Sequence, residues 1–403
     1  MKRACCLSIL IVLVASAVRA ADWPCWRGPQ RTGISPETGW LDQWPKDGPP
    51  VLWKASVGTG FSSLAVAGGK VYTLGNRDNH DTVWCFDAES GKQVWAHRYE
   101  APLEDKLFEG GPTSTPTVDG DRVYTLSRWG DLFCFDAASG KVAWSKNVHK
   151  ETSIRIPGWG YASSPVIHEN QLLLNIGEAG VALDKRTGKL LWASGDKDAG
   201  YSSPVLYQRG TDTLAIFSAD DGYTSVDLKT GKPAWNVRWL TRFGLNAAEP
   251  ILTGDTMFIS SGYGKGGGLF RIDGDEPKEV WRTRAMRNQF NSCVLLDGFL
   301  YGIDGDTTTK SFLKCVELKT GEAKWSHEGV GMGSLMIAAG RLIVLSDQGE
   351  LLVAPATPEK FAPTARAKVL EGKCWTVPVL ANGRIYCRNA AGDVICVDVR
   401  AKR

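Results

Sequence analysis

Short apolar stretches rich in β-branched and aromatic residues follow one another along almost the whole chain, separated by polar turns. Typical stretches are 71–74 (V-Y-T-L), 123–126 (V-Y-T-L) and 385–387 (I-Y-C). Such runs, flanked by Gly, Asp and Asn, are typical of β-strands joined by hairpins. Apolar residues at helical spacing are essentially missing. The pattern therefore predicts an all-β fold.

One unit recurs six times: an acidic residue followed, eight positions later, by Trp. The pairs are Asp87 with Trp95, Asp136 with Trp144, Asp184 with Trp192, Asp227 with Trp235, Asp273 with Trp281, and Glu317 with Trp325. Between acid and Trp stands S-G-K, T-G-K or T-G-E in five of the six copies. The acid can accept hydrogen bonds from the turn, and Gly supplies the positive φ that closes a short hairpin. Because the unit is copied so often, we interpret it as architecture and not as an active site.

The spacing of these units predicts a β-propeller. Trp53 to Trp325 covers six intervals in 272 residues, a mean just above 45, which is typical of a four-stranded blade. Each repeat opens with Ser-x-Pro or a variant, and these openers number eight. The seventh repeat has residues 354–363 where its acid and Trp should be, and the eighth lacks a Trp strand. We expect the strand around Trp53 to complete the eighth blade and close the ring.

Three parts of the chain are distinguished. Residues 1–20 have a basic start, then an apolar run, and end in V-R-A, a plausible cleavage site with small residues. This pattern predicts a secretory signal peptide that is cleaved near Ala20. A retained anchor is the alternative. Residues 21–50 form an irregular segment rich in Trp and Pro, which we expect to pack onto a surface. Residues 51–403 are the predicted eight-bladed propeller. We therefore expect a secreted or periplasmic protein without a transmembrane segment.

The net charge gives no support for nucleic-acid binding, and the positions of the cysteines argue against disulfides. Residues 1–20 hold three basic residues and no acid, so the 47 basic residues become 44 without them and equal the 44 acidic ones. A neutral mature chain gives no electrostatic reason to bind nucleic acid. Eight cysteines remain, and four of them (Cys85, Cys134, Cys315 and Cys396) stand two residues before the repeated acid. This place suits a small buried residue better than a disulfide.

The repeat D-x-x-[S/T]-G-K-x-x-W resembles that of the quinoprotein-type (PQQ-repeat) β-propeller superfamily. The opening D-W-P-C-W-R-G-P-Q-R-T-G-I-S-P is similar to the start of secreted PQQ-like repeat proteins, many of them BamB-like. The resemblance implies one of two activities. Some members are eight-bladed dehydrogenases that hold pyrroloquinoline quinone and calcium in the central funnel, and BamB-like members hold neither and bind protein. The adjacent Cys-Cys pair typical of the soluble dehydrogenases occurs here only at Cys5-Cys6, inside the predicted signal peptide.

Ligands of a propeller usually enter the funnel on the central axis, so the loops that lead into the innermost strands hold the candidate site. Aromatic rings with Arg and amide groups can clamp a flat anionic quinone, and carboxylate or amide oxygens can hold calcium. The residues proposed for cofactor binding are Trp159, Arg155, Asn246, Glu249, Arg287, Asn291 and Trp375. Glu249 is singled out because it replaces the Ser of other repeats. Asp304 is a further candidate calcium ligand.

Several of the residues near this candidate site also have structural explanations. Asp306 and Asp347 stand in predicted hairpins, where turn geometry alone explains an Asp. Phe61, Tyr161 and Tyr201 suit packing between blades. The five histidines form no nucleophile motif. We therefore expect a monomeric scaffold that binds a protein partner, with no catalytic residue, metal or cofactor assigned. The alternatives are a pyrroloquinoline-quinone-dependent alcohol or sugar dehydrogenase, and carbohydrate binding through exposed Trp such as Trp23, Trp26 or Trp129.

Overall fold

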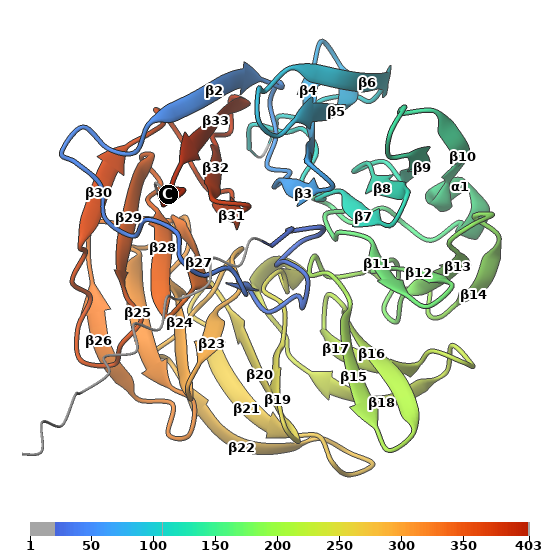
Figure 1. The fold of residues 1–403 in the computed structure, drawn as a ribbon. Helices are drawn as coiled ribbons and strands as arrows, with labels where there is room; N and C mark the ends of the chain where they lie inside the picture. Colours follow the sequence, from blue (N-terminus) through green and yellow to red (C-terminus); the bar gives the residue numbers. More distant parts are fainter. Residues whose placement is uncertain (1–20, 107, 402–403) are drawn as a thin grey trace, which may run out of the picture.

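The computed structural model describes residues 21–106 and 108–401, so the predicted signal peptide lies outside the described residues. Eight antiparallel four-stranded blades stand around a central axis, and one of them carries a fifth, parallel strand (Figure 1). The prediction of an all-β, eight-bladed propeller is confirmed. Within the described ranges, α-helix is limited to α1 (Val148–Thr152), and η1 (Arg242–Gly244) is one 3₁₀ turn. No helix in this part of the chain is long and apolar enough to cross a membrane.

The first four blades follow the chain from the innermost strand to the outermost. Blade 1 comprises β3 (Ala65–Ala67), β4 (Lys70–Arg77), β5 (His80–Asp87) and β6 (Gln93–Glu100). Blade 2 comprises β7 (Thr117–Asp119), β8 (Arg122–Leu126), β9 (Asp131–Asp136) and β10 (Val142–Asn147). Blade 3 comprises β11 (Val166–His168), β12 (Gln171–Leu174), β13 (Val181–Asp184) and β14 (Leu190–Ala193). Blade 4 comprises β15 (Val205–Arg209), β16 (Asp212–Ser218), β17 (Gly222–Asp227) and β18 (Pro233–Arg238).

The remaining blades complete the ring. Blade 5 comprises β19 (Ile251–Thr253), β20 (Thr256–Ser261), β21 (Gly266–Arg271) and β22 (Lys278–Thr283). Blade 6 comprises β23 (Val294–Leu296), β24 (Phe299–Asp304), β25 (Phe312–Glu317) and β26 (Ala323–His327). Blade 7 comprises β27 (Ser334–Ala338), β28 (Arg341–Leu345), β29 (Glu350–Pro355) and β30 (Ala365–Lys368). Blade 8 comprises β31 (Val379–Ala381), β32 (Arg384–Arg388), β33 (Asp393–Asp398) and, from the other end of the chain, β2 (Val51–Ser56).

The ring closes as the repeat pattern predicts. Strand β2 pairs antiparallel with β33, and Trp53 stands opposite Cys396. The same pairing of Trp with a small residue on the third strand joins Trp95 to Cys85 and Trp144 to Cys134. A small side chain is needed there because the indole occupies the space beside it. All eight described cysteines are buried and free, so none forms a disulfide.

In five places the indole N–H of a repeated Trp joins one blade to the next. The indole N–H of Trp95 in blade 1 donates to the carbonyl of Ala137, directly after the acid of blade 2, at 3.1 Å. Its ring lies on Gly140, where a Cβ atom would come within 2.5 Å of the indole. The acid Asp136 in turn accepts hydrogen bonds from the Ser139 backbone and hydroxyl, at 2.8 and 2.6 Å. The turn therefore needs Gly both for its φ of +70° and for this close approach.

The hydrophobic core lies mainly between neighbouring blades and not within them. One cluster joins Tyr72 and Val83 of blade 1 to Val123 and Phe135 of blade 2. Six further clusters fill the other interfaces, and the largest also contains Trp23 and Trp40 of the N-terminal segment. Trp23 is 2% exposed, so the expectation that it is an exposed carbohydrate-binding Trp is wrong. Burial of its apolar rings against blade 1 stabilises the segment instead.

The N-terminal segment 21–41 runs across the middle of the ring (dark blue in Figure 1). It pairs with blade 1 through Trp23 and Val66, and β1 (Ile34–Ser35) adds a parallel strand to β27 of blade 7. The carboxylate of Glu37 then accepts the backbone N–H of Asn382 at 2.7 Å. The segment therefore blocks one end of the central axis.

Candidate functional site

A cavity of 1290 Å³ lies on the central axis, at the end opposite the hairpins that carry the repeated acids. Its walls are the loops between consecutive blades and the hairpins joining the second and third strands of blades 5, 6, 7 and 8. Trp26 of the N-terminal segment also borders it, so this segment forms part of its floor. The loops on this face, and not the repeated spacing of the blades, determine what the cavity can bind.

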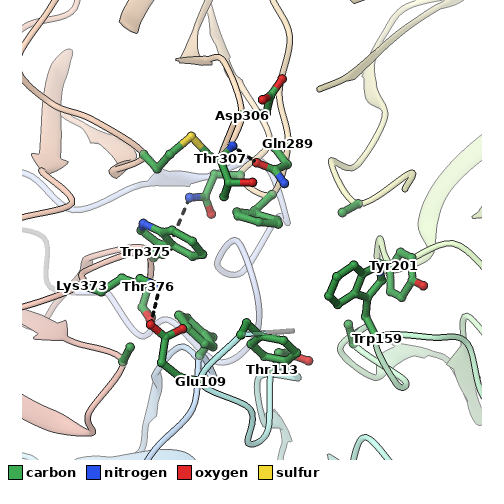
Figure 2. Close-up of a pocket in the computed structure, with 18 of the residues that line it drawn as sticks. Glu109, Thr113, Trp159, Tyr201, Gln289, Asp306, Thr307, Lys373, Trp375 and Thr376 are labelled. Atoms are coloured by element: carbon green, nitrogen blue, oxygen red, sulfur yellow. Dashed lines mark hydrogen bonds and ion pairs between the residues drawn. The ribbon is translucent and has the colours of Figure 1, made fainter. Parts of the chain in front are cut away.

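Aromatic rings cover two opposite walls. On one wall the ring of Trp375 lies 5.7 Å from Phe61 and 5.1 Å from Phe290, centroid to centroid. Across the cavity stand Trp159 and Tyr201, which come from the loops after blades 2 and 3 (Figure 2). Rings held on two sides of a cleft offer flat apolar faces to a ligand between them.

The charged groups of the lining are mostly acidic. Among the described residues of the lining, the carboxylates are Asp105, Glu109, Asp306 and Asp347, and the one cation is Lys373. Lys373 forms an ion pair with Glu109, and its ammonium lies 4.3 Å from the centre of the Trp375 ring (Figure 2). The lining therefore carries a formal charge of −3, from four carboxylates and one ammonium.

Asp306 is a fixed negative charge at the edge of this cavity. It accepts the backbone N–H of Tyr263 at 2.8 Å and both the N–H and the hydroxyl of Thr308, at 2.9 and 2.6 Å. Burial raises the pKa of Asp306, but these hydrogen bonds outweigh it and hold the pKa below its ordinary value. The group therefore stays ionised near neutral pH.

The structure brings three of the seven predicted cofactor-binding residues to the cavity: Trp159, Asn291 and Trp375. Asn291 is tied to the backbone, because its amide nitrogen donates to the carbonyls of Gly333 and Trp375, each at 3.2 Å. Phe61 and Tyr201, for which packing is the alternative explanation, also line the cavity, whereas Tyr161 is 2% exposed and belongs to the core.

The other four predicted residues lie elsewhere, each held by a partner. Arg155 is exposed and paired with Asp198. Arg287 donates two hydrogen bonds of 2.7 Å to Asp304. Asn246 is fully buried and donates to the backbone carbonyls of Ala219 and Trp239. These side chains form parts of loops and blades and do not converge on one ligand.

Glu249 forms a buried ion pair with the N-terminal segment. Its carboxylate lies 3.2 Å from the guanidinium of Arg27 in the N-terminal segment, and both side chains are 6% exposed. Arg27 also donates to the carbonyl of Cys293 in blade 6, at 2.9 Å. Burial raises the pKa of Glu249, and the charge of Arg27 opposes this rise. Glu249, which stands where other repeats have Ser, thus anchors the N-terminal segment to the ring through Arg27.

These positions do not fit a quinone with calcium. Arg287, Asn246 and Glu249 have their polar atoms engaged, and Asp304 is fully buried between Arg287 and Lys314. In the part of the chain that is described, no three His, Cys, Asp or Glu residues are arranged to hold a metal. We derive no redox step from this arrangement.

Sequence reasoning missed Asp306 and Asp347 as cavity residues. Both do stand in hairpins, as predicted, but these hairpins join the second and third strands of a blade. Such hairpins lie on the same face as the loops between blades, because an antiparallel blade of four strands turns twice on each side. The order of strands and turns in the sequence therefore already places these two hairpins on the face of the cavity.

The family described as outer membrane protein assembly factor BamB matches residues 45–113 and 79–327, well over half of the chain. No curated protein matches the sequence. Among solved structures, BamB from Moraxella catarrhalis has a TM-score of 0.65 at 16% identity and covers 87% of this chain and 100% of its own.

Two further structures share the fold. A quinohemoprotein alcohol dehydrogenase from Comamonas testosteroni has a TM-score of 0.67 at 15% identity, over 96% of this chain and 82% of its own. The computationally designed protein Ika8 has a TM-score of 0.61 at 12% identity, over 87% of this chain and 100% of its own. The architecture thus occurs in an assembly factor, an enzyme and a designed protein. The shared fold therefore does not determine the function of this chain.

Proposed function

This chain belongs to the family of the outer membrane protein assembly factor BamB, and on that premise we propose that it is a binding propeller whose axial cavity receives a segment of a protein partner. The observation that carries the proposal is the cavity itself. At 1290 Å³ it exceeds the roughly 300–1,000 Å³ typical of small-molecule sites. Its aromatic walls match the residue types that dominate binding energy at protein interfaces.

The rim of the cavity supports the same proposal. Phe243 stands at the tip of the loop between β18 and β19, is 61% exposed, and has a φ of +68°. Its ring contacts Tyr263 edge-on at 5.5 Å, and Leu245 of the same loop lines the cavity. A left-handed backbone conformation at a residue other than glycine costs on the order of 1 kcal/mol of folding free energy. Residues strained in this way cluster at ligand-binding sites. The blocked axis gives a partner segment one way in.

Panning a random heptapeptide phage library tests the proposal. The wild-type protein is compared with Ala162→Trp, which places a large ring at the cavity lining. We expect the wild type to enrich peptides that lose at least about ten-fold in affinity on the filled variant, a loss of about 1.4 kcal/mol. A control variant, Ala143→Trp on the outer strand β10, should bind them normally. Enriched peptides that bind the filled variant as well as the wild type would exclude the cavity as the site.

We also propose export with cleavage near Ala20, on the pattern of residues 1–20. Mass spectrometry of the protein purified from cells tests it, because cleavage removes these residues. A mature chain that retains Lys2 and Arg3 in the soluble fraction would exclude the proposed processing.

A further inference from the structure

The wall of the axial cavity already holds one cation, the ammonium group of Lys373. The ammonium of Lys373 lies 4.3 Å from the centre of the Trp375 ring and pairs with Glu109. A cation over an aromatic face and beside a carboxylate is a combination of two attractive contacts. One oxygen of Glu109 is nevertheless buried without a hydrogen-bond partner among the described residues. Lys373 therefore satisfies only part of the negative lining.

In the part of the lining that the structure describes, the remaining carboxylates have no cation of their own. Asp347 accepts one backbone N–H, that of Met332, at 3.2 Å, and Asp105 is exposed at the rim. Asp306 stays ionised because hydrogen bonds stabilise its charge. On the wall opposite Lys373, Trp159 and Tyr201 offer aromatic faces (Figure 2). The cavity therefore offers further carboxylates and aromatic rings, the two kinds of group that surround the ammonium of Lys373.

Three hydroxyl groups of the lining, those of Thr113, Ser202 and Thr376, are buried without a hydrogen-bond partner among the described residues. Ser202 is 1% exposed and Thr376 is 3% exposed. A buried hydroxyl without a partner is costly, so such groups point to a polar ligand that completes them. Hydroxyl oxygens accept hydrogen bonds from ammonium and guanidinium groups. These three hydroxyls therefore favour a cationic group over an apolar side chain.

We propose that the cavity recognises Lys or Arg side chains on the partner segment, with Asp347 and Asp105 as the paired carboxylates and Trp159 and Tyr201 as the aromatic faces. This inference rests on the proposed function and names the chemistry of the partner. Lys373 occupies one cation position from within the chain. It therefore acts as a competitor of the incoming basic residue and limits its affinity.

The probe is a fluorescein-labelled heptapeptide, Gly-Ser-Arg-Tyr-Arg-Ser-Gly, compared with versions in which both Arg are Gln or Glu. Fluorescence anisotropy measures the affinity of each at low salt and at about 0.15 M salt. We expect the Arg peptide to bind at least about ten-fold more tightly than the Gln peptide, and added salt to reduce the difference. Binding of the Glu peptide should be weaker still.

Variants with opposite expected signs separate recognition from stability. Asp347→Asn and Asp105→Asn should each weaken the Arg peptide about five-fold, because each removes one paired carboxylate. Lys373→Gln should tighten it by about the same factor, since it frees Glu109 and removes the competitor. Asp121→Asn, on the opposite face and 78% exposed, is the matched control and should change nothing. A merely structural role of Lys373 cannot strengthen binding.

The outcomes distinguish the two proposals. If library peptides bind in the cavity but the Gln or Glu peptide binds as well as the Arg peptide, the cavity accepts protein segments without a preference for basic ones, and this inference is wrong. Weaker binding of the Arg peptide to Lys373→Gln would also overturn it. If neither the library nor any of the three peptides binds, the proposed function itself fails.

Discussion

The indole N–H of Trp53 donates a 3.1 Å hydrogen bond to the carbonyl oxygen of Ala88, which joins the last blade of the ring to the first. The ring of Trp53 lies on Gly91, as Trp95 lies on Gly140 one blade further on. The contact that closes the propeller is therefore the same contact that joins its internal blades. It is made by a strand from the start of the described chain.

Removing the hydrogen bond of Trp53 should weaken the closed ring. Trp53→Phe keeps an aromatic ring but loses the donor, and leaves the carbonyl of Ala88 without it. Trp281→Phe is the matched control, because the indole N–H of Trp281 is buried and has no partner in the described chain. We expect Trp53→Phe to lower the free energy of unfolding by about 1–2 kcal/mol more than Trp281→Phe, measured by urea denaturation. Equal losses would show that this hydrogen bond does not stabilise the closure.

The buried pair between Arg27 and Glu249 should behave as a unit. Arg27→Met leaves Glu249 buried without its cation, which should cost about 3–5 kcal/mol. Glu249→Ser restores the residue type of the other repeats but leaves Arg27 without its carboxylate partner, with a similar cost. The double variant should recover most of that loss, because neither charge remains. In a double-mutant cycle, losses that simply add would contradict a coupled anchor.

The fold was predictable because its information is local and repeated. Acid, Gly and Trp at fixed spacing specify a hairpin, and copies of it specify the blades and the missing strand that β2 supplies. The anchor of Arg27 was not predictable, because it joins residues 222 positions apart through a segment without periodicity. The substitution at Glu249 showed only that this place is unusual.

The cavity was predictable in part. The loops leading into the blades were identified, together with the aromatic residues Trp159 and Trp375 that line the cavity. Which Arg and acid side chains face the axis depends on pairs such as Arg287 with Asp304. Those pairs form across loops whose conformations the sequence pattern does not determine.

Stability should depend on pH through Asp81, a buried carboxyl of blade 1. Burial raises its pKa to about 6, although the amide of Asn76 donates to it at 2.7 Å. An unfolded Asp titrates near pH 4. Between these values the folded state holds the proton and the unfolded state does not, so the free energy of unfolding falls as pH rises from about 4 to about 6.

Asp81→Asn removes this titration, and the neighbouring Tyr99, Asp131 and Arg128 remain in both proteins. We therefore expect the stability of the wild type, relative to that of the variant, to decrease by about 1–3 kcal/mol over this pH range. Urea denaturation at several pH values gives the comparison. A constant difference between the two proteins would mean that Asp81 does not titrate with a raised pKa.

Pyrroloquinoline quinone and calcium should not produce an active protein. The side chains expected to hold them, Asn246, Glu249 and Arg287, are engaged with other groups of the chain. Titration with both should leave the tryptophan fluorescence and the quinone absorption unchanged, and alcohols should not reduce an acceptor dye. A quinohemoprotein alcohol dehydrogenase serves as the positive control. Saturable quenching with dye reduction would contradict this expectation.

A crystal structure of the protein with the Arg heptapeptide tests the central claim most directly. The account predicts the peptide in the axial cavity, with a guanidinium beside Asp347 and its side chain against Trp159. The outer strands offer the competing site, since β6 and β22 have unpaired edges and expose Val94 at 43% and Val280 at 52%. A peptide added as a strand to one of these edges, with no peptide in the cavity, would contradict the account.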